Sequence, residues 1–322
     1  MISYSFIIPV KAINDYVRET VGHLTRIDRS DWEAFIVTDQ DEQLETQDRR
    51  IHLISSGPSG PAQKRDLAAA QSGGSILVFL DDDAYPNKNL LEVLDDAFTG
   101  EQAAIGGPAI TPPDATFFER VSGAVYSTRV GGGYVERYMP VGAVRAVTDW
   151  PSVNFSIRRS IFDAVGGFDC NFWPGEDTHL CDKLTEAHHV ILYNPNAVVW
   201  HHRRRTLTGH LKQVGSYGFH RGYFAKRFGR SSARLSYFLP SLLVIALLAS
   251  VLMIPATGLL PLVAIATTYL TAVVFAGATI LRFEKPNVAI CAVLLIPPSH
   301  LWYGVRFMSG LLKPGPLVSK LR

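Results

Sequence analysis

The first 200 residues alternate between short apolar runs and longer segments with a helical stripe. Short apolar runs bounded by turn residues are typical of strands, whereas a stripe such as Val17, Val21 and Leu24 indicates an amphipathic helix. The predicted strands are Tyr4–Val10, Glu33–Thr38, Ile51–Ile54, Ile76–Leu80, Ala103–Gly106, Val153–Ile157, Val190–Tyr193 and Val198–Trp200. The predicted helices are Asp15–Arg26, Ala62–Gln71, Asn89–Phe98, Ser160–Val165 and Thr178–His188. This alternation predicts an α/β fold with a Rossmann-like, mostly parallel sheet flanked by helices.

Residues 108–150 do not follow this alternation. Thr111-Pro112-Pro113 and Gly131-Gly132-Gly133 interrupt the pattern, and the glycine run lacks the strand–turn–helix context of a phosphate loop. We expect an irregular region here that shapes an acceptor pocket or forms a mobile loop.

The pattern changes again after Arg234. Tyr237–Ile254 and Leu259–Leu281 are apolar runs long enough to cross a bilayer, and the turn 255–258 joins them as a hairpin. A third apolar segment, Val288–Leu312, contains Pro297-Pro298, His300 and Arg306. Whether it spans, re-enters or lies in the interface stays open. We therefore predict C-terminal membrane helices, two to three of them, in residues 235–322.

Charge separates the chain into three regions. Residues 1–200 hold 16 Lys and Arg against 28 Asp and Glu, a net charge of −12, whereas residues 201–234 carry +9 and residues 235–322 carry +5. We expect the middle region to be a basic juxtamembrane helical collar that binds membrane lipid. Its Arg203-Arg204-Arg205 run could also suit a nucleic acid, but its position beside a membrane segment favours lipid, so no nucleic-acid partner is expected.

The basic residues also predict an orientation. Lys226, Arg227, Arg230 and Arg234 precede the first apolar run, and positive flanks mark the cytoplasmic side. The N-terminus lacks the basic start of a secretory signal, and three cysteines without CxxC spacing fit a reducing compartment. We expect a multi-pass protein of the inner (plasma) membrane with residues 1–200 in the cytoplasm.

Three adjacent carboxylates follow the predicted strand Ile76–Leu80. An apolar strand of this kind is buried on both faces of a parallel sheet, so Asp81, Asp82 and Asp83 lie at its carboxyl end, where α/β folds bind ligands. Oxygen ligands suit Mg²⁺ or Mn²⁺, which usually carry a substrate's phosphates. The alternative is an acidic turn that caps the next helix.

Other motifs follow in a recognisable order. Pro9-Val10 closes the first strand, Asp39 closes the second, and Arg65 lies in the helix before the acidic strand. Further along are Asn154, the Gly166-Gly167-Phe168-Asp169 segment, and Gly175-Glu176-Asp177-Thr178-His179-Leu180. Over roughly residues 4–230 the chain resembles glycosyltransferase family 2, the inverting, nucleotide-sugar-dependent enzymes of GT-A fold. The basic helix and C-terminal spans are similar to membrane-bound members that build bacterial exopolysaccharides and lipid-linked glycans.

The resemblance implies a role for each motif. It makes residues 1–200 the GT-A catalytic domain, with Asp83, Asp81 and His201 as the metal ligands and Asp177 as the general base oriented by Glu176. The donor-binding residues it implies are Pro9, Val10, Asp39, Arg65, Asp81 and Asp82, and the acceptor-binding residues are Asn154 and Trp173. The chain departs from the family pattern at Arg65-Asp66, where the family has Arg-Asn. Simpler interpretations stay open: a packing role for His201, helix capping by Asp177 and a core position for Trp173.

These observations predict a metal-dependent inverting glycosyltransferase. It would move a sugar from a nucleotide-sugar donor to a hydroxyl of a lipid-linked or membrane-associated glycan. A polyprenyl phosphate is the alternative acceptor, and a non-catalytic nucleotide-binding membrane scaffold is an alternative of a different class. A nucleotidyltransferase is disfavoured because no Gly-rich basic loop follows Pro9-Val10 to hold a triphosphate.

Overall fold

The computed structural model describes residues 3–170, 173–227, 233–315 and 317, and it divides into two compact units. The first unit consists of the chain up to Pro112 together with Met139–His202, and the second consists of Pro113–Tyr138 and Arg203–Gly315. The predicted boundary near residue 200 therefore lies close to an observed one, but residues 113–138 leave the first unit and join the second.

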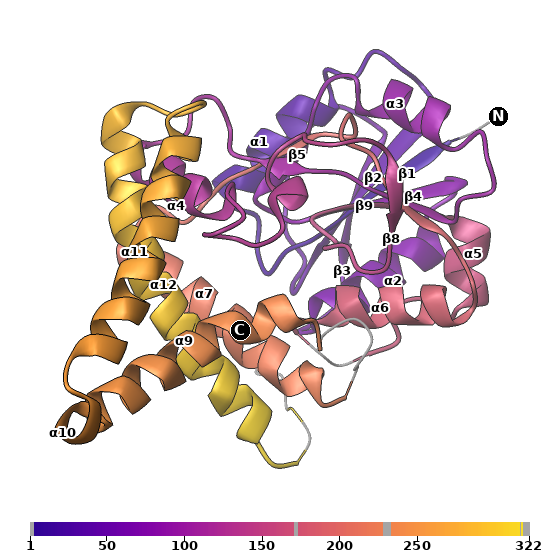
Figure 1. The fold of residues 1–322 in the computed structure, drawn as a ribbon. Helices are drawn as coiled ribbons and strands as arrows, with labels where there is room; N and C mark the ends of the chain where they lie inside the picture. The colour runs from indigo at the N-terminus through magenta and orange to yellow at the C-terminus, as the bar shows by residue number, and fades with distance from the viewer. Residues whose placement is uncertain (1–2, 171–172, 228–232, 316, 318–322) are drawn as a thin grey trace. The chain divides into compact units, whose positions relative to one another are not determined.

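An eight-stranded sheet forms the centre of the first unit (Figure 1), in the order β3-β2-β1-β4-β9-β6-β10-β8. Its strands are β1 (Tyr4–Pro9), β2 (Trp32–Thr38), β3 (Ile51–Ser55), β4 (Ile76–Leu80), β6 (Ala104–Gly106), β8 (Arg145–Val147), β9 (Asn154–Arg158) and β10 (Ile191–Tyr193). Strands β3, β2, β1 and β4 are parallel, as is the pair β6 and β10, whereas β9 and β8 run antiparallel to their neighbours. The α/β class with a mostly parallel sheet is confirmed, and the two antiparallel strands are the detail that the apolar pattern did not reveal.

Helices cover both faces of this sheet. On β4, Ile76, Val78 and Leu80 pack in one apolar core and Leu77 and Phe79 pack in another. The first core contains residues of α1 (Asp15–Leu24) and α3 (Leu90–Ala97), and the second contains residues of α2 (Pro61–Gln71), α5 (Arg159–Ala164) and α6 (Glu176–Glu186). The continuous apolar sequence of β4 follows from this burial on two faces, as predicted.

A small second sheet extends the acidic segment. It joins β5 (Ala84–Pro86), β11 (Val199–His201) and β7 (Ala109–Ile110). Strands β5 and β11 are antiparallel, and His201 is paired with Ala84. Strand β11, close to His202, therefore pairs with the segment that directly follows Asp83.

The second unit is helical in the part that the structure describes. Its elements are α4 (Phe117–Tyr126), the 3₁₀ turn η1 (Val135–Arg137), α7 (Leu207–Ala225), α9 (Leu235–Leu252), α10 (Ile254–Thr257), α11 (Leu260–Ile280) and α12 (Pro286–Leu312). The expectation of irregular structure throughout residues 108–150 is wrong at α4 and at the short strands β7 and β8. A capping box stabilises the start of this helix. The Glu119 side chain accepts a hydrogen bond from the backbone N–H of Thr116, and the Thr116 side chain accepts one from the backbone N–H of Glu119.

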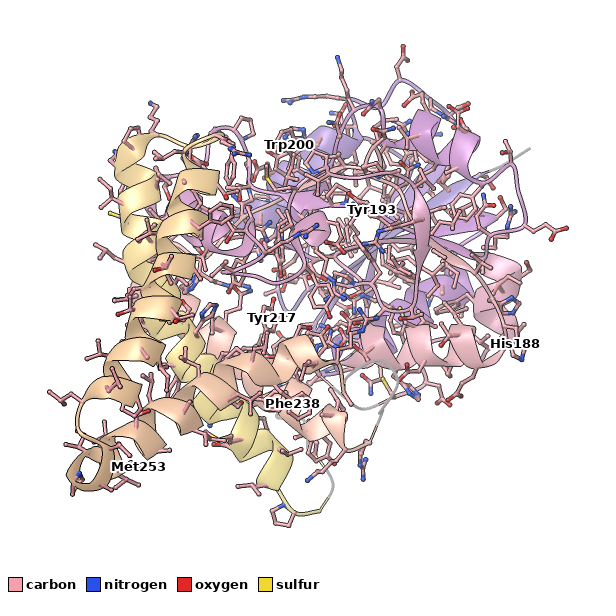
Figure 2. The ribbon with its side chains drawn as sticks, in the orientation of Figure 1. His188, Tyr193, Trp200, Tyr217, Phe238 and Met253 are labelled. Atoms are coloured by element: carbon pink, nitrogen blue, oxygen red, sulfur yellow. The ribbon has the colours of Figure 1, made fainter. Side chains whose placement is uncertain are left out.

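Helices α9, α11 and α12 are each long and apolar enough to cross a membrane. Helices α9 and α11 form a hairpin whose tip lies at α10, near Met253 (Figure 2). The third apolar segment is one helix of 27 residues, with Pro297 and Pro298 inside it. Of the predicted basic collar, Arg230 lies outside the described residues.

Candidate active site

The predicted donor and metal residues gather at one edge of the large sheet. Strands β1, β2 and β4 are parallel, so their carboxyl ends bring Pro9 and Val10, Asp39, and Asp81–Asp83 to the same side. Strand β4 ends at Leu80, and the three carboxylates follow it without a gap.

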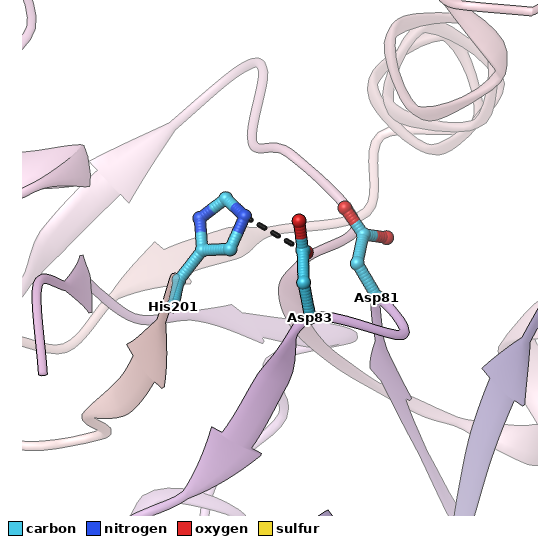
Figure 3. Close-up of side chains that lie close together, drawn as sticks. All are labelled: Asp81, Asp83 and His201. Carbon is cyan, nitrogen blue, oxygen red and sulfur yellow. Dashed lines mark ion pairs between the residues drawn. The ribbon is translucent and has the colours of Figure 1, made fainter. Parts of the chain in front are cut away.

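Asp81, Asp83 and His201 form a group that could hold a metal ion (Figure 3). One ligand atom from each residue lies within 4.8 Å of the others, and the Asp83 carboxylate is 3.1 Å from His201 Nε2. Opposite ligands of a divalent ion bound at about 2.1 Å lie about 4.2 Å apart, so these three atoms need little movement to share one ion. Carboxylate oxygens suit Mg²⁺ and Mn²⁺ while imidazole suits transition metals, so the mixed set fits Mn²⁺ well.

The pairing of β11 with β5 positions His201 beside Asp83. The register places His201 opposite Ala84, and the next residue, His202, donates its backbone N–H to Asp83 O at 3.0 Å. The His202 ring contacts Glu19 instead, with 2.8 Å between Nε2 and Oε2. The two adjacent histidines therefore have different partners, and His201 is the one that lies with the carboxylates.

The middle carboxylate of the triplet has a separate partner. Asp82 Oδ2 accepts a hydrogen bond from Asn14 Nδ2 at 2.8 Å, while Asn14 Oδ1 caps helix α1 through Val17 N. Asp82 is thereby tied to the start of α1, and the outer two carboxylates remain with His201.

Helix α2 supplies a buried cation that joins two acidic motifs. Arg65 donates from Nη2 to Asp81 at 2.7 Å and from Nη1 to Glu176 at 2.8 Å, and its side chain is only 2% exposed. Burial lowers the pKa of Arg65, but the charges of Asp81 and Glu176 outweigh this and raise the pKa overall. A planar guanidinium can bond two carboxylates at once, which an ammonium group does less well.

The residues on either side of Arg65 reach two further segments. Lys64 Nζ, also buried, donates to the Asp39 carboxylate and to Val10 O. Asp66 accepts from the backbone N–H groups of Phe168 and Asp169 at 2.8 and 3.0 Å. Successive helix positions point about 100° apart, so one turn of α2 can hold three segments in place.

Glu176 and Asp177 begin helix α6, where backbone N–H groups favour negative charge. Burial raises the pKa of Glu176 to about 7, with Arg65 opposing the rise and Asp177 adding to it. Asp177 is half-buried, and its Oδ1 accepts from Thr178 N at 2.7 Å. The pair thus consists of one carboxyl held by Arg65 and one placed at the helix start.

Comparison with known proteins decides the family. A sequence profile described as "Glycosyl transferase family group 2" matches residues 76–281, more than half of the chain. The chain belongs to glycosyl transferase family group 2. The predicted enzyme class, a glycosyltransferase, is confirmed at this level.

Two relatives and one solved structure are similar to this family 2 chain. It is 32% identical over 165 residues to the pre-mycofactocin glycosyltransferases of two Mycobacterium tuberculosis strains, an overlap of 49% of this chain and 33% of each relative. The chain therefore spans about a third of their length. A mannosyltransferase from Pyrobaculum calidifontis, solved with GDP-Man and Mn²⁺, superposes with a TM-score of 0.54 at 14% identity, covering 97% of this chain and 87% of that one. That likeness supports the GT-A fold.

The two expected acceptor residues of this family 2 chain lie in different surroundings. Asn154 is buried, and its Nδ2 donates to Pro108 O at 3.0 Å and Ala197 O at 2.7 Å, so its amide ties together the loops that follow β6 and β10. Trp173 is half-buried, three residues before Glu176. Trp150 is a core residue, stacked on Tyr193 with 5.0 Å between ring centroids.

Three contributors to the family 2 site were missed at the sequence level. Lys64, Asn14 and Glu19 bind Asp39, Asp82 and His202 respectively. The sequence carried one usable signal, the adjacent cations Lys64 and Arg65 in the first turns of a helix that follows a Gly-Pro turn. Asn14 is the N-cap of α1 and Glu19 lies within that helix, and polar residues are ordinary at both places, so the sequence does not mark either as a site residue.

Proposed function

We propose that the chain is a metal-dependent inverting glycosyltransferase. It transfers a sugar from a nucleotide-sugar donor to a hydroxyl of a lipid-linked or membrane-associated glycan. The observation that carries this proposal is the convergence of Asp81, Asp83 and His201 next to Arg65, which in turn holds Glu176 beside Asp177.

The donor would bind at the sheet edge. Asp39, which Lys64 holds, would contact the nucleotide, together with the backbone of Pro9 and Val10. Asp81, Asp83 and His201 would hold Mn²⁺ or Mg²⁺ against the diphosphate. When bound, the ion neutralises the charge of the departing nucleoside diphosphate as a Lewis acid.

Asp177 would take the proton of the attacking hydroxyl. Its carboxylate stands at the first turn of α6, half-buried and adjacent to a Glu176 that Arg65 holds in place. Asp177 would take the proton while the hydroxyl oxygen attacks the anomeric carbon and the nucleoside diphosphate leaves. Because the attack comes from the face opposite the diphosphate, the anomeric configuration would be inverted. General-base catalysis of this kind contributes about 10²–10⁴-fold in rate.

The membrane helices support a membrane-associated acceptor. Arg234 precedes α9, and Arg282 and Lys285 follow α11, so the open end of the hairpin carries positive charge. Positive flanks favour the cytoplasmic side, and we propose that the catalytic unit faces the cytoplasm at the inner membrane. There it would meet a nucleotide sugar in solution and an acceptor in the bilayer.

A donor screen tests the function. Purified full-length protein in lipid nanodiscs is incubated with a panel of nucleotide sugars and Mn²⁺ or Mg²⁺, and mass spectrometry measures release of the nucleoside diphosphate. We expect turnover of at least one donor that is lost on EDTA treatment and in Asp83→Ala, and kept in Asp96→Ala, a matched change at an exposed position of α3. Metal-dependent nucleotide binding without turnover of any donor would favour the scaffold alternative.

A further inference from the structure

Helix α12 differs from the other two apolar helices in how it packs. In its most apolar stretch 39% of the residues are buried within the protein, against 17% for both α9 and α11. At 27 residues it is about 40 Å long, enough to cross a bilayer. Length and composition therefore allow α12 to cross the bilayer, so its contacts with the other helices must show whether it does.

The first half of α12 packs against α4. Val121, Ala124 and Val125 of α4 share one apolar core with Val288 and Ala292 of α12. Next to this core, Arg120 of α4 pairs with Glu284, just before α12, at 2.7 Å. This ion pair holds the start of α12 beside α4, a helix that itself carries charged side chains.

The second half of α12 packs along α7. His210 Nε2 lies 3.0 Å from Ser299 Oγ, and Gly222 is so close to Phe307 O that no side chain would fit between them. At the far end, Lys226 Nζ donates to Leu311 O at 3.1 Å. Contacts with α7 therefore extend from the middle of α12 to its last turn.

Helices α4 and α7 both precede the first apolar helix in the chain. Within the described residues before α9, no helix is long and apolar enough to cross a membrane, and α7 carries Lys212 and Arg221 among other polar residues. Helices α4 and α7 therefore lie on one side of the membrane. Since one holds the start of α12 and the other holds its end, both ends of α12 lie on that side.

The hairpin contacts agree with this placement. Gly277, in the last turns of α11, packs on Val293, while Ser241, in the first turns of α9, donates to Gly304 O at 3.0 Å. The last turns of α11 and the first turns of α9 are the open end of the hairpin, away from its tip at α10. Helix α12 therefore crosses the hairpin from the last turns of α11 to the first turns of α9, and midway it meets α11 at Tyr269, whose hydroxyl lies 2.9 Å from His300 Nδ1.

The face of α12 turned away from these helices is apolar along its whole length. Ile290, Leu294, Leu301, Val305 and Leu312 are all exposed. At 100° per residue they fall within an arc of about 60°, opposite the buried residues. An exposed stripe of this length, continuous with two lipid-facing helices, fits a bilayer surface.

We propose that α12 lies along the membrane surface, with its apolar stripe in the lipid, and that the chain crosses the bilayer twice, through α9 and α11. This inference rests on the proposed membrane association. It places residues 313–315 on the same side as the loop 281–285, and it makes α12 a fixed support between the bilayer and helices α4 and α7.

Single-cysteine labelling tests the topology. In full-length protein with Cys170, Cys181 and Cys291 replaced, Lys285→Cys, Thr257→Cys and Lys313→Cys are labelled with a membrane-impermeant maleimide in inside-out and right-side-out vesicles. Positions 257 and 285 are exposed, and position 313 is partly exposed. We expect 285 and 313 to react from one side and 257 from the other. If the cysteine at 313 is labelled from the same side as the one at 257, α12 crosses the membrane and the proposal is overturned. If the cysteine at 257 is labelled from the same side as the one at 285, the hairpin itself does not cross, which also overturns it.

Depth measurements separate a surface helix from a re-entrant one. Nitroxides at Ile290, Leu301 and Val305 are compared by accessibility to oxygen and to a nickel chelate, with Leu239 and Leu252 of α9 as the crossing control. We expect the three α12 positions to share one shallow depth, while the α9 positions differ by about 20 Å, the rise of 13 residues. A steady depth gradient along α12, or a maximum at 301, would overturn the surface placement.

Discussion

Arg65 and Glu176 form a buried ion pair, with 2.8 Å between Nη1 and Oε1, although 111 positions separate them in the sequence. The same guanidinium binds Asp81 at 2.7 Å. One side chain thus fixes the distance between the acidic end of β4 and the start of α6. In the proposed enzyme these are the donor side and the acceptor side of the reaction.

We predict that Arg65→Lys lowers both stability and turnover. An ammonium group keeps the charge but cannot fork to two carboxylates, so Asp81 or Glu176 loses its partner. A displacement of about 1 Å at a catalytic group can cost about 10²-fold in rate. Donor turnover and thermal unfolding of the full-length protein measure both effects. Arg26→Lys, at an exposed position of the α1 end, is the matched control; wild-type turnover in Arg65→Lys would contradict the bridging role.

Glu176 predicts a pH effect on stability. Its pKa is raised to about 7 from the ordinary 4.5, mainly by burial. Between these values the folded state binds more protons than the unfolded state, so this group's contribution to stability is complete below about pH 4.5 and is lost as the pH rises through about 7. In metal-free buffer, Glu176→Gln should therefore flatten the fall in melting temperature across this window. An identical pH dependence in the wild type and the variant would rule out the raised pKa.

Asp66 is predicted to hold the glycine-rich segment before Trp173. Its carboxylate accepts from Phe168 N and Asp169 N, and Asp169 has a positive φ of 39°. Asp66→Ala leaves both N–H groups without this partner and should cost about 1–3 kcal/mol, whereas Asp66→Asn keeps one acceptor oxygen and should cost less. Hydrogen exchange of amides 167–169 and thermal unfolding measure this, with Asp163→Ala on the exposed side of α5 as control. Unchanged exchange in Asp66→Ala would refute it.

Asp177→Asn separates proton removal from donor binding. The amide keeps the size and position of the carboxylate but cannot accept a proton, so transfer should fall by about 10²–10⁴-fold with unchanged nucleotide affinity. Transfer assays and calorimetric titration with a nucleoside diphosphate and Mn²⁺ give the two numbers, and Asp96→Asn is the control. Full transfer by Asp177→Asn would remove it as the base, and it would favour an acceptor that is already anionic, such as a polyprenyl phosphate.

Much of the first unit could be predicted because its sequence signals are local. The continuous apolar run Ile76–Leu80 specifies burial on two faces, and the end of that strand places Asp81 and Asp83 at the ligand edge. The sequence pattern does not predict helix α4, although Thr116 and Glu119 form a capping box, because the Pro and Gly motifs on either side are typical of loops.

The remaining features depend on contacts between distant segments. Strand β9 has an ordinary strand pattern, and only its neighbours β4 and β6 make it antiparallel. Lysine is usually a surface residue, and Lys64 is buried because its ammonium group binds Asp39, which follows strand β2. The packing of α12 along α4 and α7 likewise cannot be read from hydropathy, since an apolar helix of this length has the same composition whether it crosses a bilayer or lies on it.

The location of a bound Mn²⁺ ion tests the proposed metal site directly. A structure of the full-length protein with a nucleoside diphosphate and Mn²⁺, with anomalous data collected at the manganese edge, should show one peak within about 2.5 Å of oxygens from Asp81 and Asp83 and of His201 Nε2. A peak elsewhere, or a diphosphate bound at the sheet edge with these side chains turned away from it, would contradict the proposed metal-dependent transfer.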